Sequence, residues 1–298
     1  MAALQRIATV PLRPTKQHSR GGIVEQITFK QCFKGAWRDG FDALRSRPIL
    51  CLSIAVIVLV MFALGVSLKS LALEMAHDGT PAGPRIRLGL TSFAVMIVNV
   101  VAFTVLALHV YRYVILGPQA AREAHWYGRD LWRYLWTVIQ IFVGMAVVWV
   151  VLVVLAVLAM RSTGRTTSFA LLGTFFVLLF CGLIYVLVRV QLIYGQIAAG
   201  RSKRWRAAWR DSHGHFWAMF GTTLVSVLPL VVVGIVLTIL FRLALVLMPD
   251  ATLVVFGSLV LQTLLSVAWI AVAIGSAAWV YRRFANELLQ LDDAPDDI

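Results

Sequence analysis

The sequence predicts an all-α protein, a polytopic transmembrane bundle of six helices. Six apolar runs are each long enough to cross a bilayer, none contains Asp or Glu, and hydrophobic residues make up 60% of the chain. A spanning helix needs about 20 mostly apolar residues, and a helix satisfies its own backbone hydrogen bonds inside lipid. The predicted spans lie at 49–71, 88–116, 134–160, 168–195, 217–247 and 252–281.

The segment before the first span predicts an amphipathic helix. Thr28 is its candidate N-cap, and Pro48 predicts a break before the span. Five apolar residues at helical spacing form one stripe: Phe29, Phe33, Trp37, Phe41 and Leu44. Two placements stay open. The helix lies in the headgroup plane with this aromatic stripe toward the acyl chains, or it packs under the bundle as a collar.

The spans are apolar on all sides, as in Val147–Leu158, so they offer no face to water. Span 5 contains Pro229, which predicts a kink. Span 6 carries a small-residue face that predicts tight helix packing: Ala268, Ala271, Gly275 and Ala278. No linker rich in Pro, Gly or Ser divides the spans. We therefore expect one membrane domain at 26–285, between a basic tail at 1–25 and an acidic tail at 286–298.

A short motif recurs before spans 1, 3 and 5. Residues 36–41, 127–132 and 208–213 each contain Arg-Asp close to a Trp. An arginine also recurs at the same end of spans 2, 4 and 6, as Arg112, Arg189 and Arg282. We therefore expect three repeats, each an interfacial helix followed by two spans, related by an axis along the membrane normal.

The net charge of +13 is compatible with a nucleic-acid partner. However, the placement of the charge along the chain favours lipid. With the N-terminus in the cytoplasm, 21 of the 27 Lys and Arg residues flank the spans on the inner side. Lys and Arg close to span ends stay in the cytoplasm, so we expect both termini there. The same cations meet anionic headgroups, which predicts anionic membrane lipids as partners and no nucleic acid.

Arg112, Arg189 and Arg282 are the leading candidate residues for a site. One interpretation is structural, since a cation at a helix C-terminus complements the helix dipole and its long side chain can reach the interface. The other interpretation is that the repeats bring the three arginines together at the cytoplasmic mouth of the bundle. Guanidinium groups there would bind lipid phosphates or the acids of a membrane-protein partner.

The repeated motif supplies a second set of arginines, each followed by Asp: Arg38, Arg129 and Arg210. Adjacent residues on a helix do not face one another, so these pairs are expected to act as surface charge, to pair between repeats, or to pair with the leading arginines. The tryptophans near the span ends are expected to anchor in the membrane interface: Trp37, Trp132, Trp205, Trp209 and Trp217.

No motif in the chain names a reaction. The only metal-like group is His213 and His215 with Asp211 and His125, and interfacial histidine beside aromatic residues is the favoured interpretation. We expect neither enzyme activity nor a cofactor. The three cysteines lack zinc or disulfide spacing and are expected to be small apolar fillers: Cys32, Cys51 and Cys181.

The pattern running from Arg189–Gly195 through Ala207–Asp211 to Phe216 and Trp217 resembles that of a known group of proteins. These are bacterial six-span membrane proteins that include the membrane domain fused to some glycerophosphoryl diester phosphodiesterases. The resemblance extends over most of 30–285 and implies a six-helix bundle. It does not imply phosphodiesterase chemistry, because the acidic metal ligands of the soluble catalytic domain are not in this sequence.

Together these features predict a non-enzymatic integral protein of a bacterial inner membrane. It would act at the cytoplasmic face as a scaffold or a lipid-interacting factor. The alternative is a transporter or lipid translocator working through the bundle centre, which requires a continuous polar path. Away from the ends of the spans the polar residues are few and uncharged: Asn99, Gln140, Thr174, Gln191 and Gln262.

Overall fold

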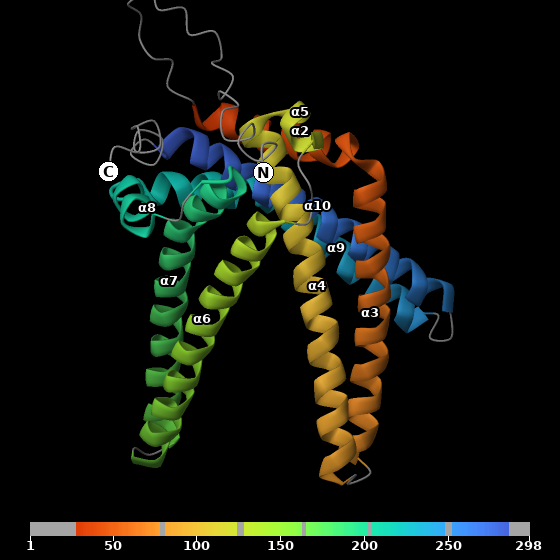
Figure 1. Cartoon of the computed structure of the whole chain (residues 1–298). Coiled ribbons are helices and arrows are strands. Elements are labelled where there is room, and N and C mark those ends of the chain that lie inside the picture. The colour runs from red at the N-terminus through yellow and green to blue at the C-terminus, as the bar shows by residue number, and fades with distance from the viewer. Residues whose placement is uncertain are drawn as a thin grey trace, which may run out of the picture. The chain divides into compact units, whose positions relative to one another are not determined.

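The computed structural model describes residues 28–77, 81–123, 128–162, 165–201, 204–247 and 252–285. These ranges are helical and contain no strand, which confirms the all-α class. Both predicted tails and His125 lie outside the described residues. The helices are α2 Phe29–Ser46, α3 Pro48–His77, α4 Ala82–Leu116, α5 Pro118–Glu123, α6 Arg129–Ser162, α7 Arg165–Ala198, α8 Trp205–Asp211, α9 Phe216–Leu247 and α10 Thr252–Phe284 (Figure 1).

Six of the helices are long and apolar enough to cross a membrane: α3, α4, α6, α7, α9 and α10. The chain is therefore a multi-pass membrane protein. Each predicted span lies inside one of these helices, although most of the helices extend beyond the apolar run. The 35 residues of α4 measure about 52 Å at about 1.5 Å per residue, longer than the hydrocarbon thickness of about 30 Å. The helix ends therefore reach into the headgroup regions.

The chain divides into two compact units. The first unit comprises residues 1–126 and 221–279, and the second comprises residues 127–220 and 280–298. Helices α9 and α10 each run from one unit into the other. Shorter helices precede each pair of long ones, but the units do not follow the three expected repeats, and the repeat arrangement stays a prediction.

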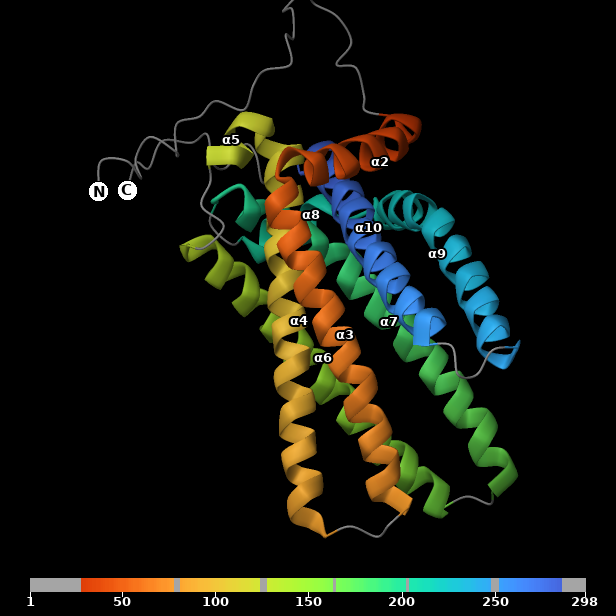
Figure 2. The same ribbon diagram turned by 90° about the vertical axis from the view of Figure 1, so that its right-hand side faces the viewer.

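In the first unit, α3 and α4 form an antiparallel hairpin, and α9 and α10 run side by side (Figure 2). Helix α2 begins as predicted at Thr28, whose hydroxyl accepts from the Gln31 N–H while the Gln31 side chain accepts from the Thr28 N–H. This capping box satisfies two of the donors that a helix start leaves free. The helix ends at Ser46, and α3 starts at Pro48, where a proline suits the first turn.

Helix α2 packs on α10 through small residues. A Cβ at Gly40 would lie 2.8 Å from the Ala271 carbonyl oxygen, and one at Gly275 would lie 2.7 Å from the Ala36 carbonyl oxygen. The buried side of α2 is Cys32, Gly35, Ala36, Gly40 and Ala43. Small residues let backbones approach closely in membranes. The small-residue face predicted on span 6 therefore serves to seat α2, in agreement with the collar interpretation.

The aromatic stripe of α2 lies beside this small-residue side and is half-buried, apart from the exposed Phe29. The indole N–H of Trp37 donates to the Ser226 carbonyl at 3.0 Å, close to Pro229 in α9. The indole N–H of Trp279 in α10 donates to the Asp39 carboxylate at 3.0 Å. Helix α2 is thus bonded to both α9 and α10. Its position in the headgroup plane remains a prediction.

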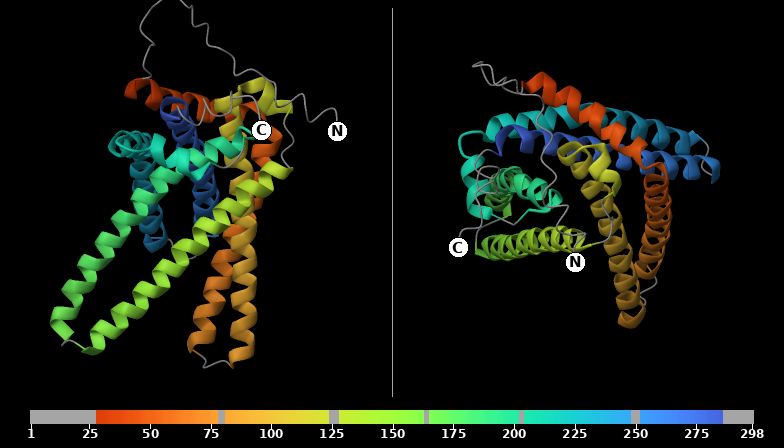
Figure 3. Two further views of the ribbon diagram at one scale, coloured as in Figure 1. Left: turned by 60° about the vertical axis from the view of Figure 1, so that its left-hand side comes forward. Right: turned by 45° about the horizontal axis from the view of Figure 1, so that its top comes forward.

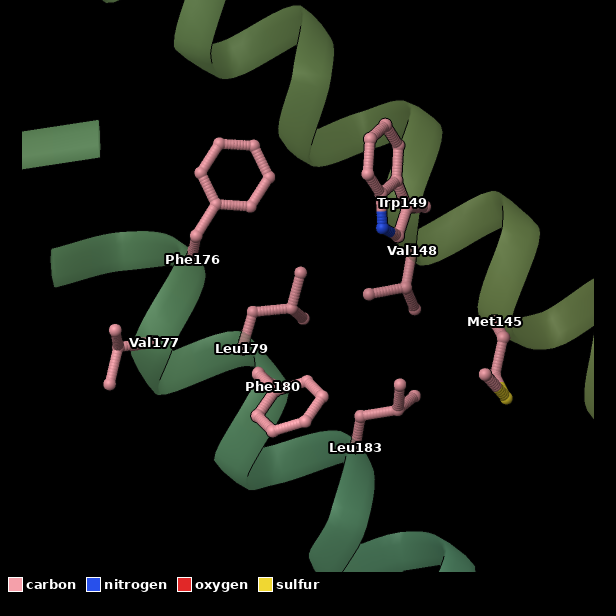
Figure 4. A pocket seen from close by; sticks show the side chains of 8 residues that line it. All are labelled: Met145, Val148, Trp149, Phe176, Val177, Leu179, Phe180 and Leu183. Carbon is pink, nitrogen blue, oxygen red and sulfur yellow. The ribbon is translucent and has the colours of Figure 1, made fainter. Parts of the chain in front are cut away.

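In the second unit, α6 and α7 form a second hairpin (Figure 3). Near one end of the hairpin the rings of Tyr134 and Tyr194 lie 4.9 Å apart, and Gly195 packs directly against the Tyr281 ring. Farther along, an open apolar groove of about 330 Å³ lies between the two helices, and Trp149 and Phe176 are among the residues that line it (Figure 4). Many large apolar side chains of α6 and α7 are exposed, as expected for surfaces that face lipid.

Candidate anion site at Arg189

Arg189 lies in the second unit, nine residues before the end of α7. Only 5% of the residue is exposed. A long cationic side chain near a helix end usually extends its charged group to water. The burial of Arg189 shows that snorkelling does not describe this side chain.

Two aromatic rings flank the guanidinium group. Its Cζ lies 4.5 Å from the Tyr185 ring centroid and 4.3 Å from the Trp209 ring centroid. The two rings meet edge to face at 84°, with centroids 6.3 Å apart, so the guanidinium occupies the corner between them. Tyr185 is one turn earlier on the same helix, where i and i+4 residues share a face, and α8 supplies Trp209.

The Nε of Arg189 is buried and has no hydrogen-bond partner among the residues that the structure describes. The two rings supply cation–π attraction worth about 0.5–2 kcal/mol each. A buried charge is costly without a partner that accepts its hydrogen bonds. An anion at the open edge of the guanidinium would supply that partner, and phosphate or carboxylate matches its planar donor fork.

The surroundings of this corner are aromatic and basic. Phe216, at the start of α9, packs on Tyr185 with ring centroids 5.0 Å apart and stacks with Phe220 at 5.8 Å. Arg206 and Arg210 project from α8 as exposed side chains. The buried Gln196 side chain accepts a hydrogen bond from the Arg204 N–H at 3.2 Å and thereby fixes the start of α8 on α7. An anion at Arg189 would therefore enter a positively charged environment.

The other two arginines of the leading set have different settings. Arg112 is buried in the first unit, and Arg282 is exposed in the second. Arg112 belongs to a different unit from Arg189 and Arg282. The expected convergence of the three arginines therefore remains a prediction. Of the three, Arg189 packs on the aromatic rings of Tyr185 and Trp209.

The arginines of the three Arg-Asp motifs lie on the surface. Arg38 is 84% exposed in its side chain and lies 3.8 Å from Asp42, one turn away. Arg129 and Arg210 are also exposed. Four of the predicted anchors are exposed tryptophans, as an interfacial role requires: Trp132, Trp205, Trp209 and Trp217. The fifth, Trp37, is half-buried by its bond to α9.

His109 is a structural residue that the sequence patterns did not single out. Its Nε2 donates to the Ala43 carbonyl at 3.0 Å and lies 3.1 Å from the Ser46 hydroxyl, so it fixes the end of α2 to α4. The available signal was a histidine on an apolar span close to its polar end. The contact partner lies 66 residues away in the chain, which periodicity within one span does not reveal.

The described residues contain no group of three or more His, Cys, Asp or Glu side chains that could hold a metal ion. His215 packs on the Phe284 ring with centroids 5.1 Å apart. Cys32 is buried in the small-residue side of α2, in its predicted role as a filler, whereas Cys181 is exposed on α7.

Fold and site together define a multi-pass α-helical membrane protein with a buried arginine in an aromatic corner. Comparisons with protein-family models, curated proteins and solved structures find no match to this chain.

Proposed function

We propose that this chain is a non-enzymatic, lipid-interacting protein of a bacterial inner membrane, and that Arg189 binds the phosphate of an anionic phospholipid. One observation carries the proposal: the buried side chain of Arg189 is flanked by two rings, and its Nε has no hydrogen-bond partner among the described residues. Phospholipid is the phosphate source present at every membrane interface. Exposed aromatic side chains close by, at Trp209 and Trp217, suit that interface.

The alternation of the spans supports a position of Arg189 on the cytoplasmic side of the membrane. If each of the six long helices crosses the membrane once, the ends of α4, α7 and α10 lie on one side, together with α2 and α8. This is the side with most of the Lys and Arg residues, and such residues stay in the cytoplasm. Anionic lipid headgroups of the inner leaflet would then meet Arg189.

The proposal is tested by native mass spectrometry of the full-length protein titrated with phosphatidylglycerol or phosphatidylcholine in a non-ionic detergent. We expect Arg189→Gln to lower the retained phosphatidylglycerol about tenfold, since hydrogen bonds to charged groups contribute about 1.5–3 kcal/mol. The matched control is Arg87→Gln, which removes an exposed arginine from α4 in the first unit and should leave retention unchanged. Equal retention by wild type and Arg189→Gln, with both folded, would reject the proposal.

Native mass spectrometry also tests the alternative prediction that the protein is a scaffold. Protein extracted gently from its own membrane would carry a protein partner at fixed stoichiometry if scaffolding is its role. Retention of phosphatidylglycerol without such a partner favours lipid handling.

A further inference from the structure

A long apolar groove opens in the first unit between α3 and α4. Its volume is about 710 Å³, and its walls include Ile54, Ile57, Val98, Val101 and Val105. This volume falls within the range of about 300–1,000 Å³ that is typical of small-molecule sites. Ser53 is its one hydroxyl side chain, and Arg47 lies at one end.

The groove has the depth of one membrane leaflet. From Arg47 to Ile57 it follows ten residues of chain, and at about 1.5 Å per residue this equals about 15 Å along α3. The hydrocarbon core of a bilayer is about 30 Å thick. The groove is therefore about as long as one leaflet of the hydrocarbon core is thick.

The Arg47 end of the groove is suited to an anion. Arg47 occupies the break between α2 and α3, and α3 begins at the next residue, Pro48. The N-terminus of a helix carries partial positive charge, which adds to that of the guanidinium. Arg47 donates to the Arg122 carbonyl, and its guanidinium is a planar cation whose donor fork matches phosphate geometry.

We infer that the groove binds one phospholipid, with its phosphate at Arg47 and one acyl chain along α3 and α4. The apolar walls select a hydrocarbon chain, and the cationic end selects a phosphate headgroup over an uncharged one. This site lies in the first unit, shares no residue with the Arg189 corner and goes beyond the proposed function. The test has two competing outcomes. The groove binds a free fatty acid, or lipid covers the whole surface without preference for the groove.

The test uses full-length protein in nanodiscs that contain phosphatidylglycerol with a diazirine near the end of one acyl chain. Peptide mapping after irradiation should place the label on 49–57 and 97–105. Val98→Trp should lower that labelling roughly fivefold or more, because an indole occupies the volume of the chain. The matched control is Met96→Trp. Both positions are 40% exposed on α4, but they lie about 200° apart around the helix.

Two further variants test the headgroup. Arg47→Gln should lower labelling of the groove by the diazirine phosphatidylglycerol, whereas Arg45→Gln, whose arginine is 82% exposed outside the groove, should not. Labelling that is unchanged in Val98→Trp, or spread evenly over α3 and α4, would overturn the groove as a site. Equal labelling by a diazirine fatty acid, unaffected by Arg47→Gln, would overturn the phosphate contact. Arg189→Gln should leave groove labelling unchanged, so failure here and failure at Arg189 are distinguishable.

Discussion

The sequence Ala-Trp-Arg-Asp occurs twice, at 36–39 in α2 and at 208–211 in α8. In the first copy the indole N–H of Trp37 donates to a backbone carbonyl of α9, and Asp39 accepts from Trp279 of α10. In the second copy the ring of Trp209 packs on the buried guanidinium of Arg189. The same four-residue motif therefore fixes a helix in place in one unit and contributes to a candidate site in the other.

The difference arises from the helix that each copy meets. Helix α2 has 18 residues and presents a side of small residues that fits closely on α10. Helix α8 has only seven residues and packs beside Arg189 of α7. Changes in α2 should therefore affect stability, whereas changes around α8 should affect lipid retention.

The largest expected effect is on the seat of α2. Gly275→Ala places a Cβ 2.7 Å from the Ala36 carbonyl oxygen, and we expect a loss of about 1–3 kcal/mol in the free energy of unfolding, as for overpacking. The control is Gly89→Ala in α4, where a Cβ meets nothing within 4 Å; it should stabilise by about 0.5–1 kcal/mol. Thermal unfolding in detergent measures both. A stable Gly275→Ala protein would contradict the close packing of α2.

His109→Ala should have the next largest effect. It removes the hydrogen bond to the Ala43 carbonyl and the contact with Ser46, and we expect a loss of about 1–2 kcal/mol, because a hydrogen bond and the packing of a buried ring are lost together. His77→Ala, at an exposed histidine of α3, serves as the control. Faster hydrogen exchange at the end of α2 in His109→Ala alone would show that the loss is local.

The two copies of the motif can be compared directly by one substitution. Trp37→Phe removes the indole donor to Ser226 and should cost about 0.5–1.5 kcal/mol of stability, with lipid retention unchanged. Trp209→Phe keeps a ring over Arg189 and should retain phosphatidylglycerol, whereas Trp209→Ala should not. Unfolding curves and native mass spectra of the three variants separate the two roles. Loss of lipid in Trp37→Phe would contradict the division of roles.

Arg38→Ala should have the smallest effect. The side chain is 84% exposed and its ion pair with Asp42 is long, at 3.8 Å. Exposed pairs contribute about 0.2–1 kcal/mol, so we expect a change of a few tenths at most in unfolding measurements at moderate salt. A large loss would mean that Arg38 has a structural role comparable to that of Trp37.

Composition and local pattern were sufficient to predict the fold class, the six spans, the Thr28 cap and the break at Pro48. Each depends on residues within one turn or one apolar run. The aromatic stripe of α2 was also found correctly, but the neighbouring small residues Cys32, Ala36 and Gly40 were not recognised as its packing side. Their spacing of four was a usable signal, since small residues at that spacing favour close helix contact.

The Arg189 corner could be predicted only in part. Arg189 and Trp209 were each named as candidates, yet their contact depends on how α8 packs on α7. A residue pattern within either helix does not contain that information. The same applies to His109 and Ala43, which are far apart in sequence and bonded in the structure.

The most direct test of the central claim is an electron cryo-microscopy map of the full-length protein in nanodiscs made with phosphatidylglycerol. The account predicts headgroup density at the guanidinium edge of Arg189, within hydrogen-bonding distance, and its loss in Arg189→Gln. A protein carbonyl or carboxylate bonded to Arg189 in that map, with no lipid density, would contradict the claim that this arginine binds an anionic lipid.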